Sequence, residues 1–137
     1  IQDRGRLSSI KETADKNNPR KFIKWLKSGK SVMYAIDQDY GWDHSVKLKF
    51  FNQNAATITT TRKIVDATNA NLLFINSFYE NKKLVLNIEL IRHDGLNSIE
   101  LAQKINDLME EKILEHPAEY LWMHRRFKST LGKNFYK

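Results

Sequence analysis

The chain has 137 residues, of which 41% are hydrophobic, and its lysines and arginines outnumber its acids by 23 to 16, a net charge of +7. This length suits one domain or part of a larger one, and the apolar fraction is too high for a disordered chain. The absence of cysteine excludes disulfides and thiolate metal sites. The basic charge favours polyanionic partners, namely nucleic acid, anionic lipid or an acidic carrier protein, without choosing among them.

The amino-terminal third of the chain predicts a helix followed by a strand. Asn18 suits the N-cap of a helix, Pro19 suits its first position, and Gly29 ends the apolar pattern. Residues 31–36 have the length and apolar character of a short buried strand. They lead into a polar turn at residues 37–41.

The next segment gives weaker signals. Residues 42–49 fit no single element, although the apolar side chains that follow alternate as in a strand: Val46, Leu48 and Phe50. We interpret residues 52–57, which are polar or small, as a loop. Residues 59–68 are predicted to form a helix.

The second half of the chain predicts a hairpin and a long helix. Residues 72–79 and 84–91 are of strand length and are separated by a short polar segment. A helix capped by Asn97 or Ser98 extends to about His116, with an apolar stripe made of Ile99, Ala102, Ile105, Leu108, Met109 and Ile113. Alternating helices and strands indicate an α/β fold. The longest apolar stretch is far short of the roughly 20 residues that span a bilayer.

The segment 117–128 is the most specific feature of the sequence. Its centre, residues 124–126, places a histidine and two arginines between Trp122 and Phe127. Arginine forks bind phosphate in a bidentate way, and flanking aromatic rings can fix a segment against protein or an interface. The alternative is a terminal segment docked by its two rings with solvated charges, which composition alone favours.

A pair of acids, Asp37 and Asp39, follows the predicted strand 31–36. Strand ends in α/β sheets are common ligand sites, and such a pair could hold a cation, orient a hydroxyl or pair with an arginine. Turn chemistry is the alternative, since Asp and Gly favour turns. Thr57 and the threonines at 59–61 precede or open a predicted helix, where they could cradle phosphate or act as ordinary N-caps.

Three blocks, in matching order, resemble the bacterial lipid A biosynthesis acyltransferases and cover nearly the whole chain. Residues 34–41 resemble the family's Asp-x-Asp strand end, with Ile36 where proline is common. Residues 50–60 resemble its Phe-Phe-x5-Thr-x-Thr-Gly loop, with Thr60 in place of the glycine. The tail is similar to the terminal motif Pro-x-Glu/Gln-Tyr/Trp-x-Trp-x-His-Arg-Arg-Phe/Trp-Lys, which it matches at Pro117, Glu119, Tyr120, Trp122, His124, Arg125, Arg126, Phe127 and Lys128.

This resemblance implies that residues 1–137 form the carboxy-terminal part of a single acyltransferase domain, a fragment of a glycerolipid-acyltransferase-like mixed sheet flanked by helices. It implies transfer of a fatty acyl chain from acyl carrier protein to a hydroxyl of a lipid A precursor. The implied partners are acyl carrier protein, a phosphorylated glycolipid acceptor and the membrane surface, but not nucleic acid. The implied location is the cytoplasmic face of the inner membrane. No metal and no cofactor is expected beyond the acyl carrier thioester.

The resemblance also assigns roles to residues. It makes Asp37 an active-site acid and Arg6 the supporting active-site arginine, with Arg4 as the competitor for that role. The expected substrate-binding residues are Asp39, His124, Arg125, Arg126 and Lys128.

The family is expected to use a His-x4-Asp/Glu motif, in which the histidine deprotonates the acceptor hydroxyl and the acid orients the imidazole. No histidine of this chain has an acid at the required spacing, since those positions hold Lys49, Ser98, Leu121 and Ser129. We therefore expect this dyad and an amino-terminal membrane anchor to lie upstream of Ile1, and the fragment to be inactive alone. A half domain could also leave apolar sheet surface uncovered.

A basic nucleic-acid-binding module is the alternative function. Basic charge near Tyr120, Trp122 and Phe127 could support stacking on bases. Against it, the basic residues are spread over several predicted elements, and no nucleic-acid-binding motif appears.

Overall fold

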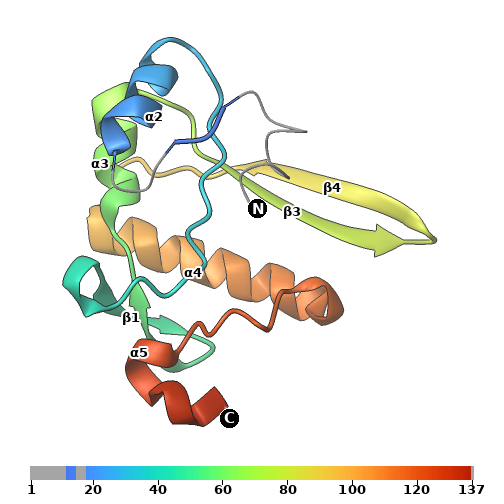
Figure 1. The fold of residues 1–137 in the computed structure, drawn as a ribbon. Helices are drawn as coiled ribbons and strands as arrows, with labels where there is room; N and C mark the ends of the chain where they lie inside the picture. The colour runs from blue at the N-terminus through green and yellow to red at the C-terminus, as the bar shows by residue number, and fades with distance from the viewer. Residues whose placement is uncertain (1–11, 15–17, 137) are drawn as a thin grey trace.

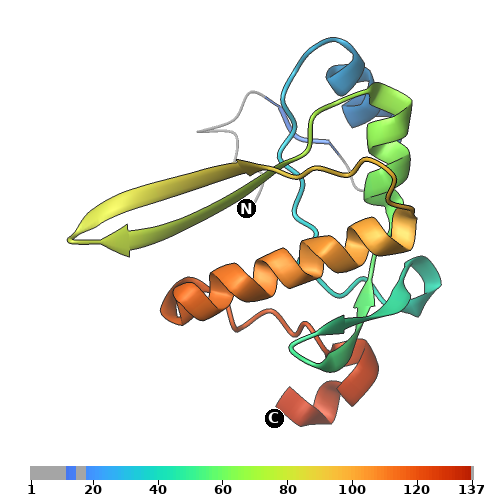
Figure 2. The same ribbon diagram turned by 180° about the vertical axis from the view of Figure 1, so that it is seen from behind.

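A computed structural model describes residues 12–14 and 18–136 (Figures 1 and 2). It confirms the α/β class, with helices and two small antiparallel sheets. In chain order the elements are the helix α2 (Pro19–Lys27), the 3₁₀ turn η1 (Trp42–His44), the strands β1 (Val46–Phe50) and β2 (Gln53–Thr57), the helix α3 (Thr60–Thr68), the strands β3 (Leu73–Glu80) and β4 (Lys83–Leu90), the helix α4 (Ser98–Glu115), the 3₁₀ turn η2 (Pro117–Glu119), the helix α5 (Lys128–Leu131) and the 3₁₀ turn η3 (Lys133–Tyr136).

The helix α4 carries the core and begins as predicted. The Asn97 side chain accepts hydrogen bonds from the N–H groups of Ile99 and Glu100, and the Glu100 carboxylate accepts the N–H of Asn97, which completes a capping box. Ile99 was expected on the apolar stripe but is 53% exposed in the first turn. The buried face of α4 consists of Leu101, Ala102, Ile105, Asn106, Met109 and Ile113.

The prediction of a loop at residues 52–57 is wrong, because this segment contains β2, paired antiparallel with β1. Phe51 and Asn52 both have positive φ (48° and 58°), as the two central residues of a tight hairpin turn require. The turn brings Ala55 and Ala56 back against the core, where both are fully buried. The small side chains led to the prediction of a loop, but in the structure they allow the strand to approach the core closely.

The predicted hairpin at residues 72–91 is confirmed as β3–β4, with a turn at Asn81 and Lys82, which also have positive φ. In Figures 1 and 2 this hairpin projects to one side, with its turn at the free end. Among the described residues β3 and β4 pair only with each other, as do β1 and β2. The expected mixed sheet is thus represented in this part of the chain by two antiparallel pairs.

The predicted strand at residues 31–36 is wrong, because this segment has no regular secondary structure and pairs with no strand of the described chain. Met33 is 93% exposed. A strand needs a neighbour that takes up its N–H and C=O groups, and an apolar pattern alone does not reveal whether one exists. The preceding helix α2 is confirmed with Pro19 in its first turn, although the Asn18 side chain makes no capping hydrogen bond.

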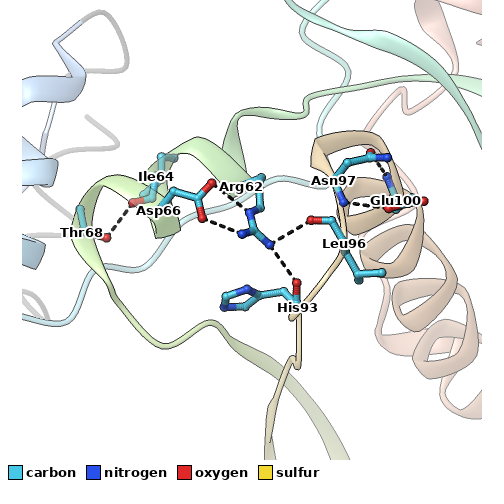
Figure 3. A network of polar contacts seen from close by, with 8 residues as sticks. All are labelled: Arg62, Ile64, Asp66, Thr68, His93, Leu96, Asn97 and Glu100. Atoms are coloured by element: carbon cyan, nitrogen blue, oxygen red, sulfur yellow. Dashed lines mark hydrogen bonds and ion pairs between the residues drawn. The ribbon is translucent and has the colours of Figure 1, made fainter.

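Arg62 ties α3 to the start of α4 (Figure 3). Its guanidinium forms a two-pronged contact with Asp66 one turn further along α3, at 2.9 and 3.0 Å. It also donates to the carbonyls of His93 and Leu96, both at 2.9 Å. One side chain therefore fixes the turn that leads into the capping box. Within the described residues, no helix combines the length and apolar character needed to cross a bilayer.

Candidate functional site

The acidic loop that follows residue 36 meets the basic tail, although about 90 residues separate them in sequence. Asp39 is buried, and its carboxylate accepts hydrogen bonds from the Ser129 N–H at 2.8 Å, the Ser129 hydroxyl at 2.7 Å and the Gly41 N–H at 2.9 Å. The indole N–H of Trp42 adds a bond to the Ser129 carbonyl at 2.9 Å. The loop and the first turn of α5 are therefore held together as one unit.

An open hollow of about 240 Å³ lies where these two segments meet. It is lined by Gln38, Asp39, Met123, His124, Arg125 and Lys128. Four of the expected substrate-binding residues thus surround one space. Within the described residues, no three His, Asp or Glu side chains are grouped as a metal site would need.

Arg126, the fifth expected substrate-binding residue, points into the protein and is only 2% exposed. It donates to the Ala56 carbonyl at 2.7 Å, the Thr57 hydroxyl at 2.9 Å and the Asn106 side-chain oxygen at 3.5 Å. Asn106 in turn donates to Thr57 at 3.2 Å and to the Lys49 carbonyl at 2.8 Å. These contacts join the tail to β2 and α4, and they favour a positioning role for Arg126 over direct contact with a ligand.

Burial and nearby charges shift the pKa values of Arg126 and its neighbour Tyr120. Burial lowers the pKa of Arg126, and the charges of Tyr120, Asp39 and Asp37 oppose that shift. Burial raises the pKa of Tyr120 to about 12, and the Asp37 carboxylate adds to this shift. The Tyr120 hydroxyl and Nε of Arg126 are buried and have no hydrogen-bond partner among the residues that the structure describes.

Asp37 is half-buried, and its carboxylate accepts no hydrogen bond from a described residue. Among the described residues nothing therefore occupies the Asp37 carboxylate, whereas the Asp39 carboxylate is fully engaged. Arg6 and its competitor Arg4 lie outside the described residues. Their proximity to Asp37 stays a prediction.

The threonines behave differently from one another. Thr57 belongs to the buried Arg126 network, and Thr60 pairs with the Tyr34 hydroxyl at 3.1 Å. Thr59 precedes α3 but makes no side-chain capping bond.

Sequence reasoning missed Asn106 and Ser129 as residues that shape the site. The signal for Asn106 was present, because a polar side chain within the apolar face of a helix must find a buried partner. Ser129 gave no such signal, since a serine after a basic run is an ordinary surface residue.

Comparison with known proteins agrees with the blocks that meet in this site. The family described as bacterial lipid A biosynthesis acyltransferase matches residues 1–129. Two proteins of Escherichia coli (strain K12), the lipid A biosynthesis lauroyltransferase and palmitoleoyltransferase, are 35% and 33% identical over 134 residues. The lipid A biosynthesis acyltransferase of Haemophilus influenzae (strain ATCC 51907 / DSM 11121 / KW20 / Rd) is 27% identical over 135 residues.

The chain therefore belongs to the bacterial lipid A biosynthesis acyltransferase family, and the resemblance seen in its sequence is confirmed. Each alignment covers 94% of this chain but only 43–44% of the relative. The chain thus spans less than half the length of the relatives it matches.

Proposed function

We propose that this chain is part of an enzyme that moves a fatty acyl chain from acyl carrier protein to a hydroxyl of a lipid A precursor. Family membership supports the reaction class. The observation that carries the proposal to particular residues is the hollow between the acidic loop and the basic tail. There, the exposed side chains of Arg125 and Lys128 lie beside His124 and the loop that carries Asp39, an arrangement that suits a phosphorylated sugar.

In this proposal, Arg125, Lys128 and His124 bind the phosphate of the glycolipid acceptor. Arg125 and Lys128 are exposed, and both line the hollow with His124. Arginine offers phosphate a planar fork of donors, and lysine offers a compact charge. Phosphate binding would hold the acceptor in register without taking part in the reaction itself.

Asp37 and Arg6 are the supporting active-site residues of the proposal. The Asp37 carboxylate can accept a hydrogen bond from a sugar hydroxyl, because no described residue occupies it. Asp39 and Arg126 hold the loop and the tail in place through their buried hydrogen bonds. Holding reactants in one geometry can lower a barrier by several kcal/mol.

The transfer itself needs a base and an acyl donor. The acceptor hydroxyl loses its proton to the base, and its oxygen bonds to the thioester carbonyl carbon. The C–S bond then breaks, and the departing sulfur takes that proton from the base, which releases the carrier thiol. We propose that the base is the histidine of a His-x4-Asp/Glu motif in the rest of the enzyme, so that this fragment alone is inactive. The net charge of +7 suits both an acidic carrier protein and the cytoplasmic face of an inner membrane.

A chimera tests the proposal. This chain would replace the matched 134 residues of the E. coli palmitoleoyltransferase, and acyl transfer from acyl carrier protein to a lipid A precursor would be measured. We expect Asp37→Ala and Arg6→Ala to lower kcat/KM by roughly a hundredfold, and Arg125→Ala to act mainly through KM for the phosphorylated acceptor.

Two exposed residues away from the hollow, Asp43 and Arg20, provide matched controls. Asp43→Ala and Arg20→Ala should leave kcat/KM unchanged. If Asp37→Ala, Arg6→Ala and Arg125→Ala were as active as these controls, the assigned roles would be rejected. Tight, salt-sensitive binding of RNA by the chain, without lipid affinity, would favour the nucleic-acid alternative.

A further inference from the structure

One face of the β3–β4 hairpin, which we call the outer face, is apolar along its length and exposed. The register places Leu73 opposite Leu90, Ile75 opposite Ile88, Ser77 opposite Leu86 and Tyr79 opposite Leu84. Residues directly opposite in antiparallel strands share a face, and alternate residues of each strand return to it. Except for Ser77, all of these side chains are large and hydrophobic, and they are 52–64% exposed.

The other face of the hairpin already packs within the chain. Phe74 contacts the hydrophobic core, and the Phe78 ring stacks on His116 at 3.7 Å between centroids. An antiparallel sheet with one solvated face normally carries polar residues on that face. The leucines and isoleucines of the outer face are instead typical of a sheet buried on both sides.

The edges of the hairpin are also incomplete. Within the described residues, β3 and β4 bond only to each other, so each has a free edge of N–H and C=O groups. A two-stranded hairpin is marginal by itself, and a third strand or a covering layer is needed for stability. In the part of the chain that the structure describes, the hairpin therefore lacks both a neighbour at its edges and a cover on its outer face.

A membrane fits this surface poorly. In hydrocarbon every exposed backbone group is left without a hydrogen-bond partner, so open sheet edges are not found there. A protein cover can supply both apolar side chains for the face and backbone groups for the edges. The lipid A acyltransferases that match this chain have more than half of their length outside the match, which is enough to provide both.

We propose that the outer face and the free edges of β3–β4 form the seam against which the remainder of the acyltransferase domain packs. The proposal rests on the proposed function to the extent that it takes this chain as part of such a domain. The hairpin would then join the two parts of the enzyme. The hollow near Asp39 lies on other elements, namely the loop at 38–39 and the segment 123–128.

The chain has no cysteine, so a single thiol introduced at Leu86 reports on the seam. The reaction of Leu86→Cys with a maleimide would be followed in the 137-residue chain and in the palmitoleoyltransferase chimera, with cysteines of the remainder replaced by serine. We expect the rate to fall roughly tenfold or more in the chimera, because a covered thiol reacts only after local opening. Lys63→Cys, at an exposed position of α3, should react equally fast in both proteins.

Equal labelling of Leu86→Cys in the chain and in a folded chimera would overturn the proposal. Protection of the isolated chain by phosphatidylglycerol vesicles would assign the face to a membrane, and protection that grows with protein concentration would assign it to a second copy. Either result also overturns it. Labelling needs no catalysis, so a chimera that protects Leu86→Cys but transfers no acyl chain would refute the proposed function alone.

If the chimera fails to fold, measurements on the isolated chain still test the proposal. A seam that is uncovered in this chain predicts that Leu86→Asp raises its solubility and leaves its thermal midpoint within about 2 °C of the parent, since exposed substitutions change stability little. Leu114→Asp, at an exposed leucine of α4, is the matched comparison for solubility. A large fall in the midpoint with Leu86→Asp would show that the face already packs within the chain, and would overturn the proposal.

Discussion

Replacing Arg126 by alanine is expected to destabilise the fold strongly, although its neighbour Arg125 looks identical in the sequence. Arg126 is 2% exposed and donates two short hydrogen bonds, to the Ala56 carbonyl at 2.7 Å and to the Thr57 hydroxyl at 2.9 Å. A hydrogen bond that involves a charged group contributes about 1.5–3 kcal/mol, so the two contribute roughly 3 kcal/mol or more. Burial of the cation has its own cost, which the alanine variant recovers in part.

We therefore expect Arg126→Ala to lower the free energy of unfolding by about 3 kcal/mol. For a chain of this length that corresponds to a fall in Tm of roughly 10 °C. Arg126→Lys should lose about half as much, because it keeps the charge but not the planar fork. Urea denaturation followed by circular dichroism would measure both values.

Arg125→Ala is the matched control. Its guanidinium lies 6.0 Å from the centre of the Tyr136 ring but is otherwise exposed, so the loss should be below about 0.5 kcal/mol. If Arg126→Ala cost no more than Arg125→Ala, the buried network would not be what holds the tail, and the positioning role of Arg126 would fall with it.

Two further predictions concern the loop and the tail. Asp39→Ala removes three hydrogen bonds to a carboxylate and should cost about 4.5 kcal/mol. Ser129→Ala removes only the hydroxyl bond and should cost about 1.5 kcal/mol. Equal losses in urea denaturation would contradict this ranking. Tyr120 has a pKa near 12 when folded and about 10 when unfolded, so the unfolded chain loses its proton first and stability falls as pH rises from about 10 to 12. Tyr120→Phe should remove roughly 1 kcal/mol of that fall, a value reduced because the ring is only half-buried. Tyr79→Phe, which changes an exposed ring, serves as the control. If the stability of Tyr120→Phe depended on pH as that of the parent does, the prediction would be rejected.

The buried hydrogen bonds of Arg126 and Asp39 also hold the segments of the candidate site together. Arg126 connects the tail to β2 and α4, and Asp39 connects the tail to the acidic loop. The residues proposed to contact substrate are thus held by neighbours that make no such contact. In the segment 123–128, the outward side chains are those proposed to contact substrate, and the inward side chain of Arg126 holds the segment in place.

Local sequence determined the elements whose stabilising contacts are themselves local. The helix α4 was predictable because its cap, Asn97 with Glu100, and its apolar period lie within one segment. The β3–β4 hairpin was predictable because two alternating runs flank a short polar turn. The resemblance to the family could likewise be recognised in the sequence, because each of its motifs is a contiguous block and the three blocks follow the family's order.

Tertiary structure decided what depends on distant partners. Residues 31–36 have a strand-like pattern but no neighbouring strand in the described chain, whereas residues 53–57 look like a loop and pair with β1. Arg125 and Arg126 are the same residue type in adjacent positions, and only the second meets β2, 70 residues away. Which of the two arginine side chains is buried depends on where a distant segment places its hydrogen-bond acceptors. A local sequence pattern does not show which distant segments lie close in space.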